Sequence, residues 1–174
     1  KLSYNIEDCK LYIIKIHTDF TERDKLAERE YNNYQNLKHP FLPQLIEYYP
    51  NKDNDYSYLV IEYIDGTTLC DFDLINLNEF EIYNIIFEIM IIIHYIHSKN
   101  YILRDLKPDN IKIDKNNTAI LIDLDRVIKI NDDDDSEFTY DFNHEYVSPE
   151  ISKGTKFTNK TDIYSLGLIV KKMF

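Results

Sequence analysis

The stretch YILRDLKPDNIKID, residues 101–114, combines a dense polar cluster with apolar flanks. Five charged or amide side chains fall within seven residues, around Pro108: Arg104, Asp105, Lys107, Asp109 and Asn110. A strand does not tolerate that run, and proline is excluded from a helix interior because it lacks an amide hydrogen and clashes with the preceding turn. The pattern predicts a loop that holds polar groups in place on a rigid scaffold. Taken alone, the stretch also fits a charged surface turn.

The composition sets bounds on the size and the partners of the protein. Its 174 residues correspond to about one domain, and 44% hydrophobic residues suffice for a sizeable core. The net charge of −11 disfavours nucleic acid or an anionic membrane surface as the main partner.

Signals of cellular compartment are few and point to the cytoplasm. Cys9 and Cys70 lie far apart without ligand-like spacing, which is typical of reduced thiols rather than of a disulfide framework. The N-terminus has no signal-peptide pattern. The most apolar run, residues 82–96, is interrupted by polar side chains and is too short to span a bilayer. We therefore expect a cytoplasmic protein without a membrane partner.

The hydrophobic pattern predicts a small strand–helix–strand unit followed by a mostly helical unit, an α+β organisation. A short hairpin, with the turn KNNT between NIKID and AILIDLD, should lie where the two units meet. Asn78 and Glu81 form a capping box that starts the long helix, which is apolar nearly all round and should be buried. The strands are predicted at residues 10–16 and 56–64, and the helices at 21–38, 78–97 and 161–174.

Periodicity also predicts which side chains face inward. Alternation places Ile13 and Lys15 on one face of the first predicted strand. Glu30 shares a helix face with Tyr34 and Leu37, while Glu28 points elsewhere. A half-buried carboxylate is costly unless it is paired, so Lys15 is a candidate partner for Glu30.

Two histidines near the end of the long helix, His94 and His97, could form a metal pair or pack structurally. Their place in the last turns favours a structural role, as histidines that either suit the helix dipole or pack against neighbours.

A series of motifs, in order and in register, resembles the motifs of protein kinases. The segment LRDLKPDN resembles the catalytic loop H-R-D-L-x-x-x-N. Asp123 lies 18 residues after Asp105 and resembles the metal-binding Asp of D-F-G. Glu30 stands at the spacing of the family's helix glutamate, ten residues before Pro40. The remaining matches are YIIK to V-A-I-K, YLVIEYIDG to the strand entering the hinge, EYVSPE to A-P-E, and DIYSLG to D-x-W-S-x-G.

The resemblance implies a eukaryotic-type, serine/threonine-like kinase catalytic domain that is truncated at both ends. Such a domain has a two-lobed α+β fold. Residues 1–62 would form a partial, β-rich N-lobe, and residues 63–174 the hinge and a partial C-lobe. The last predicted helix would be the one that the family labels αF. The family's first strand and Gly-rich loop would lie upstream of this chain, and further helices downstream.

The resemblance assigns phosphoryl-transfer roles to the opening stretch. Asp105 would accept or orient the substrate proton, and Lys107 would stabilise the transferring phosphate. Asn110 and Asp123 would hold Mg²⁺ through oxygen ligands. Lys15 would hold the α- and β-phosphates of ATP and pair with Glu30. The acceptor would be a serine or threonine of a protein substrate.

The resemblance also assigns residues to the nucleoside and to regulation. Adenine would bind the hinge backbone at Glu62 and Ile64, behind Ile61 as gatekeeper, and Thr68 would reach the ribose. Two regulatory residues are further implied: Arg104 would face a phosphorylated activation loop, and Thr139 would be the modified residue. Thr139 also fits an ordinary loop threonine, and the acidic run at 132–135 fits either a constitutive charge or a solvated loop.

Four positions depart from the family pattern. Leu103 replaces the histidine of H-R-D, and Asp125 replaces the glycine of D-F-G, where Arg126 could offset its charge. Ile13 replaces the alanine of V-A-I-K, and Lys112 takes the apolar position below the adenine.

Three functions therefore stay open. The first is an ATP- and Mg²⁺-dependent protein serine/threonine kinase. The second is a pseudokinase that acts as a nucleotide-binding or scaffold module. The third is a small-molecule phosphotransferase of the wider kinase-like fold.

Overall fold

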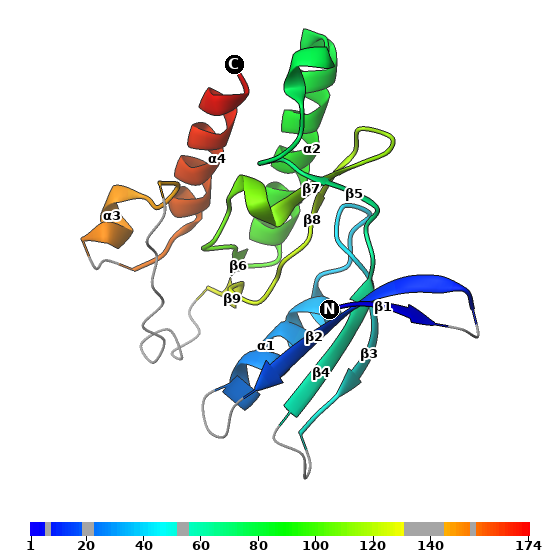
Figure 1. Cartoon of the computed structure of the whole chain (residues 1–174). Coiled ribbons are helices and arrows are strands. Elements are labelled where there is room, and N and C mark those ends of the chain that lie inside the picture. Colours follow the sequence, from blue (N-terminus) through cyan, green and yellow to red (C-terminus); the bar gives the residue numbers. More distant parts are fainter. Residues whose placement is uncertain (6–7, 19–22, 52–55, 131–144, 154–155) are drawn as a thin grey trace.

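The computed structural model describes residues 1–5, 8–18, 23–51, 56–130, 145–153 and 156–174 of the chain. They form two parts, a β-sheet with one helix and a mostly helical part (Figure 1). This is the two-lobed α+β arrangement that the resemblance implies.

The N-terminal part is an antiparallel sheet of four strands in the order β1-β2-β4-β3. The strands are β1 (Leu2–Asn5), β2 (Lys10–Thr18), β3 (Leu45–Tyr49) and β4 (Tyr56–Glu62). The predicted strands at 10–16 and 56–64 are confirmed with shifted ends, whereas the sequence pattern did not predict β1. Alternating residues of β4 are buried, because one face of the sheet packs against the helix α1.

The helix α1 (Arg23–Asn36) presents a buried stripe to the sheet and to the second part. Ala27, Glu30 and Tyr34 are at most 2% exposed, in line with the predicted inward face. Asn33 lies on the same side and donates hydrogen bonds to the carbonyl oxygens of Leu124 and Val127, at 2.9 and 2.8 Å. The helix therefore joins the two parts through buried polar contacts.

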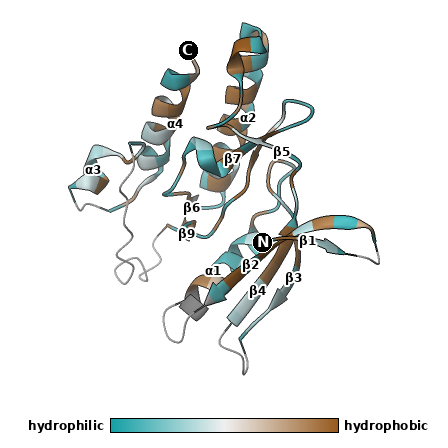
Figure 2. Ribbon diagram, in the orientation of Figure 1, coloured by the Kyte–Doolittle hydropathy of each residue, from teal (hydrophilic) through white to brown (hydrophobic). Residues whose placement is uncertain are grey.

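The long helix α2 (Glu79–Ser98) begins with the predicted capping box, in which the side chains of Asn78 and Glu81 accept from each other's backbone amides. Its length and composition would suit a membrane span, but one face is buried inside the protein. Hydrophobic residues run along much of the helix (Figure 2). The expectation that it is buried all round is wrong, because a hydrophobic stripe stays exposed: Phe80, Tyr83, Phe87 and Met90.

Short strands connect the parts and carry the polar loop. A three-stranded sheet has the order β5-β7-β8, with β5 (Gly66–Thr68), β7 (Ile111–Asp114) and β8 (Ala119–Leu121). The pairing of β7 with β8 confirms the predicted hairpin. β5 approaches β7 so closely that a Cβ on Gly66 would lie 2.3 Å from the carbonyl oxygen of Ile113, which explains the glycine. The other elements are η1 (Leu74–Asn76), β6 (Tyr101–Ile102) paired with β9 (Ile128–Lys129), η2 (Pro108–Asn110), α3 (Pro149–Ser152) and α4 (Asn159–Met173).

Asp162 in the first turn of α4 anchors the loop that follows β6. Its carboxylate is fully buried and accepts from the backbone amides of Leu103 and Arg104, at 2.9 and 3.0 Å. The same carboxylate lies 2.7 Å from Nε2 of His97, which agrees with the packed role expected for that histidine. Arg104 has a φ of 68°, a left-handed conformation that few side chains adopt. The buried acceptor thus fixes a strained part of the backbone.

Replacing Asp162 by alanine should strongly destabilise the protein, because two amides and an imidazole would lose their buried acceptor. Breaking a buried charged contact typically costs about 3–5 kcal/mol in the free energy of unfolding. Urea unfolding followed by circular dichroism measures the loss. Asp65→Ala, at an exposed position, is the control and should change stability by less than about 0.5 kcal/mol. Equal stability of the two variants would contradict the anchoring role.

Candidate active site

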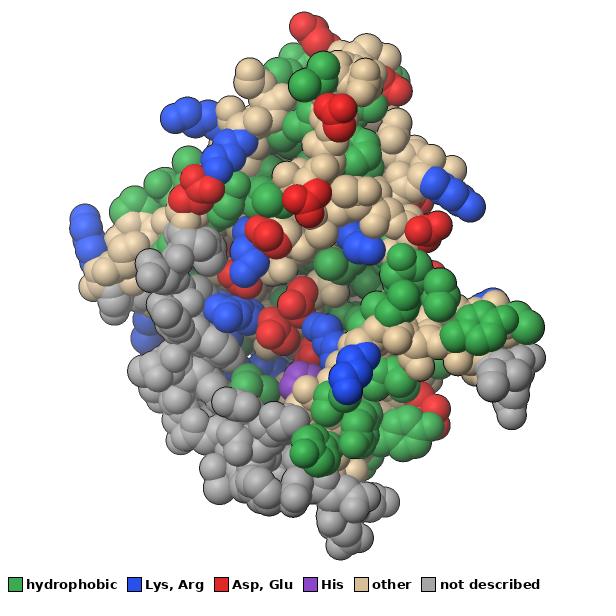
Figure 3. Space-filling view, in the orientation of Figure 1, with side chains coloured by type: hydrophobic (Ala, Val, Ile, Leu, Met, Phe, Trp, Pro, Cys, Tyr) green, Lys and Arg blue, Asp and Glu red, His purple; other side chains and the backbone are tan. Residues whose placement is uncertain are grey.

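The predicted polar residues meet where the two parts of the chain face each other. Acidic and basic side chains gather there with a histidine, in a hollow framed by hydrophobic side chains (Figure 3). A cavity of about 420 Å³ opens at this place. It is lined by Lys1, Ile14, Lys15, Ile16, His17, Glu30, Asp123 and Asp125.

Lys15 on β2 joins two carboxylates that come from different elements. Its Nζ contacts Oε1 of Glu30 on α1 and lies 2.6 Å from Oδ1 of Asp123, which follows β8. The predicted pairing of Lys15 with Glu30 is thus confirmed as a contact. Burial by itself lowers the pKa of Lys15, but the charges of Glu30 and Asp123 outweigh it and raise that pKa above its ordinary value. The lysine is therefore held as a cation.

Glu30 has a second neighbour that sequence reasoning missed. Nε2 of His17 lies 3.2 Å from Oε2 of Glu30, a close polar contact without the alignment of a hydrogen bond. Burial raises the pKa of Glu30, but the imidazole of His17 and the ammonium of Lys15 hold it below the ordinary value. The alternation that put Lys15 on the inward face of its strand could have identified His17, two residues further on.

Asp105, Lys107 and Asn110 form a second cluster on the anchored loop. Nζ of Lys107 lies 2.9 Å from Oδ2 of Asp105. The amide nitrogen of Asn110 donates to the backbone oxygen and to Oδ2 of Asp105, at 2.9 and 3.2 Å. The loop therefore fixes the direction of the Asp105 carboxylate, and the amide oxygen of Asn110 is the atom that could meet a cation.

The residues predicted to hold Mg²⁺, Asn110 and Asp123, offer oxygen ligands, which this cation prefers. In the part of the chain that the structure describes, no group of three or more His, Cys, Asp or Glu side chains could hold a metal. Two protein ligands still suit Mg²⁺, because it usually keeps several waters and phosphate oxygens. The donor set thus fits a nucleotide-bound magnesium ion.

Asp125 adds a third carboxylate beside Lys15. Its backbone amide lies 3.2 Å from Oδ1 of Asp123. Burial, followed by the charge of Asp123, raises the pKa of Asp125 to about 6. Its φ is not in the left-handed region, so the position does not require the glycine of the family pattern. Arg126, expected to offset this charge, has its Nε 3.7 Å from Asp105 and lowers the pKa of Asp125 only weakly.

At the place predicted for the base, a side chain of this chain is bound to the hinge backbone. Ile13 is paired with the buried Ile61 across β2 and β4. Nζ of Lys112 donates to the carbonyl oxygen of Ile64 at 2.9 Å and lies 5.1 Å from the ring centre of Tyr63. The head of Lys112 is therefore bound to the hinge rather than directed into solvent.

The other two residues predicted to bind the nucleoside already make hydrogen bonds within the chain. The amide of Glu62 donates to the carbonyl oxygen of Gln44 at 2.9 Å, which leaves its own carbonyl as the group for a base. The hydroxyl of Thr68 donates to Asp71 at 2.9 Å, so a ribose would have to share or displace that contact.

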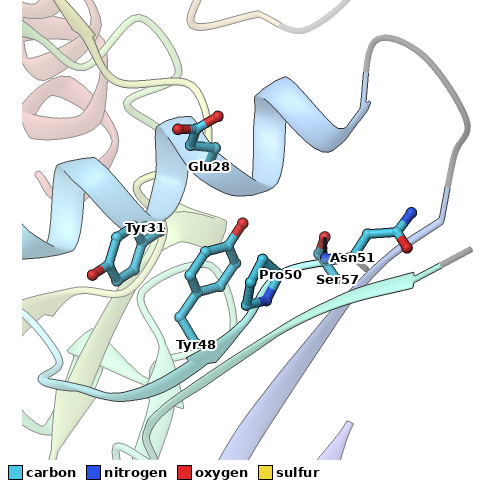
Figure 4. Close-up of a pocket in the computed structure, with 6 residues that line it drawn as sticks. All are labelled: Glu28, Tyr31, Tyr48, Pro50, Asn51 and Ser57. Atoms are coloured by element: carbon cyan, nitrogen blue, oxygen red, sulfur yellow. Dashed lines mark hydrogen bonds between the residues drawn. The ribbon is translucent and has the colours of Figure 1, made fainter. Parts of the chain in front are cut away.

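Glu28 faces away from this site, as predicted. It lines a separate cavity of about 280 Å³ between α1 and the strands β3 and β4 (Figure 4). Tyr31 and Tyr48 stack in that cavity with their ring centres 4.4 Å apart.

Neither regulatory expectation is tested by the residues that the structure describes. Arg104 is 4% exposed, and its Nε donates to the carbonyl oxygen of Arg126 at 2.7 Å. Thr139 and the acidic run at 132–135 lie outside the described residues.

Comparison with known proteins adds independent findings. The model of the family described as "Protein kinase domain" matches residues 1–174. "Serine/threonine-protein kinase Nek8" of Danio rerio is 30% identical over 95% of this chain and 24% of its own length. "Calcium-dependent protein kinase 6" of Plasmodium berghei is 33% identical in a match that covers 97% of this chain and 12% of the length of that relative. "Mitosis inhibitor protein kinase SWE1" of Candida albicans is 36% identical in a match that covers 67% of this chain and 10% of the length of that relative. The chain thus spans less than a quarter of the length of each of these relatives.

Asp125→Asn should change how stability depends on pH. In the wild type, the folded chain binds more protons than the unfolded one between pH 4 and 6, because the pKa of Asp125 is about 6 when folded. The free energy of unfolding therefore falls as the pH rises through this window. At pH 7 the variant should be more stable than the wild type by on the order of 1–2 kcal/mol.

Urea unfolding at several pH values tests this expectation. The gain should vanish below about pH 4, where the wild-type carboxyl is protonated in both states. The exposed Asp109→Asn is the control and should show no comparable gain. A gain that is the same at pH 3.5 and pH 7 would contradict the assigned cause.

Proposed function

This chain belongs to the protein kinase family, and we propose that it is an active serine/threonine kinase that transfers the γ-phosphate of ATP to a protein hydroxyl. The position of Lys15 carries the proposal. The contact of this lysine with Glu30 is the one that kinases need in order to hold nucleotide phosphates. Its second contact, with Asp123, brings the candidate metal ligand to the same point.

The chain's own residues would position the reactants rather than take part in covalent chemistry. Magnesium-bound ATP supplies the transferable phosphoryl group and neutralises charge when it is bound. Lys15 would hold the α- and β-phosphates, while Asn110 and Asp123 would hold the metal ion.

The loop after β6 would orient and activate the acceptor hydroxyl of the protein substrate. Asp105 would orient the serine or threonine hydroxyl and accept its proton. Lys107, whose Nζ lies 2.9 Å from Oδ2 of Asp105, would stabilise the transferring phosphate. The anchoring of this loop by Asp162 supports the proposal, because catalytic groups need fixed positions.

A second function, a pseudokinase that binds partners, is favoured by a specific observation in the base pocket. Nζ of Lys112 donates a hydrogen bond to the carbonyl oxygen of Ile64, a hinge group that a base could otherwise use. Ile13 adds bulk opposite Ile61, the expected gatekeeper. Both changes oppose base binding, whereas neither removes a phosphate or metal ligand. The two functions therefore differ in nucleotide affinity and in phosphoryl transfer.

Asp105→Asn should abolish phosphoryl transfer and leave stability nearly unchanged, because the amide keeps the shape but cannot accept the proton. General-base catalysis contributes about 10²- to 10⁴-fold in rate, and a loss of that size is expected. The assay measures Mg²⁺-dependent transfer from labelled ATP to a generic protein substrate, using the full-length protein.

Asp109→Asn, four residues further along the same loop and exposed, is the matched control and should keep full activity. Full activity of Asp105→Asn would remove this residue from the mechanism. Absence of transfer in the wild type, together with no ATP-induced thermal shift, would favour the pseudokinase.

Lys112→Leu should tighten ATP binding, because the hinge carbonyl would be released and an apolar floor restored. The expected gain is about tenfold in Kd, the value of roughly one charged hydrogen bond. Ile13→Ala should act in the same direction by making room for the base.

Isothermal titration calorimetry with Mg²⁺ and ATP measures both effects. Lys115→Leu, at an exposed lysine in the turn after β7, is the control and should leave Kd unchanged. Unchanged or weaker binding in Lys112→Leu would show that the lysine does not compete with the base.

A further inference from the structure

The carboxylate of Glu30 has one oxygen that its expected partner does not satisfy. Glu30 is 0% exposed, and Lys15 contacts only Oε1. Oε2 accepts no hydrogen bond from the residues that the structure describes. A buried carboxylate oxygen is costly unless a donor or a charge faces it. The atom that faces it is Nε2 of His17, at 3.2 Å.

Lys15 alone does not fix the orientation of Glu30, because this lysine is shared. Its Nζ also lies 2.6 Å from Asp123, a carboxylate on the other part of the molecule. Asp125 adds further negative charge to the same cavity. When Lys15 turns toward Asp123 or toward a phosphate, Glu30 needs another contact to keep its direction.

The fold holds His17 where that contact can be made. His17 lies two residues after Lys15, so both side chains leave the same face of β2 toward α1. Its backbone is paired with Ser57 of β4, inside the sheet rather than in a loop. The side chain is 17% exposed, which limits the directions in which the ring can turn.

We propose that His17 is a positioning residue for the Lys15–Glu30 pair: its Nε2 holds Oε2 of Glu30, so that Oε1 faces Lys15. The purpose of this positioning, phosphate binding, rests on the proposed kinase function. The contact between His17 and Glu30 does not depend on that function.

Three substitutions separate this role from simple packing. In His17→Gln the amide nitrogen takes the place of Nε2, whereas in His17→Asn it takes the place of Nδ1 and falls short of Glu30. His17→Leu fills the space without a donor. A packing role would favour leucine or treat the two amides alike, but the proposed role requires glutamine to rescue and asparagine to fail.

The first readout is the rate at which an amine-reactive ester acylates Lys15, measured by peptide mass spectrometry. It requires neither nucleotide nor activity. Because an oriented Glu30 keeps Nζ of Lys15 engaged in its contact and less available to the reagent, His17→Asn and His17→Leu should react about threefold to tenfold faster, the range expected for the loss of one polar contact. His17→Gln should stay within about twofold of the wild type.

His94→Leu, at an exposed histidine on α2, should leave the acylation rate of Lys15 unchanged. Glu30→Gln should give the highest acylation rate, because the carboxylate itself is removed. If His17→Leu does not fold, the comparison of the glutamine and asparagine variants still tests the positioning role of His17. Equal acylation of Lys15 in these two variants would overturn the proposal.

The second readout is the kinetics of phosphoryl transfer. His17→Asn should raise KM for ATP about threefold to tenfold with a smaller effect on kcat, and His17→Gln should restore KM. If the wild type transfers no phosphate, the proposed kinase function fails, whereas the acylation rates still decide the role of His17. A change confined to kcat would overturn the positioning role.

Discussion

The burial of the Glu30 carboxylate is the constraint on which the arrangement of this molecule depends. A fully buried charge requires a cation, and Lys15 on the neighbouring strand supplies it. Lys15 also contacts Asp123, so one ammonium joins the sheet, the helix α1 and the segment after β8. Asn33, one turn after Glu30, adds hydrogen bonds to two backbone carbonyls of that segment. The two parts are thus joined at the place where the candidate chemistry lies.

A second buried carboxylate, Asp162, has the corresponding role in the C-terminal part. It holds the backbone at Arg104, where the chain takes a left-handed conformation, and so sets the start of the polar loop. Asp105 and Asn110 then bind each other within that loop. The position of Lys15 and the position of the loop that carries Asp105 therefore each depend on a buried carboxylate, Glu30 in the first case and Asp162 in the second.

The two halves of the candidate cleft differ in how far they follow the kinase pattern. The half that would hold phosphates and metal keeps Lys15, Asn110 and Asp123. The half that would hold the base contains Lys112, whose ammonium is bound to the hinge carbonyl of Ile64. A lysine has a long stem and a strongly hydrated head, so a base could use that stem as a floor only after the head is displaced. Nucleotide affinity is therefore the property that Lys112 should affect most directly.

The sequence by itself determined the order of the main elements, the inward face that carries Glu30, the capping box at Asn78 and the spacing of the motifs. Those features are local, since periodicity, capping and residue intervals operate within one segment. The tertiary structure alone decided that His17 faces the second oxygen of Glu30, that Lys112 reaches the hinge and that one face of α2 stays exposed. A periodic pattern shows which way a side chain points, but what lies opposite depends on segments distant in sequence, and a long side chain takes the rotamer that its neighbours allow.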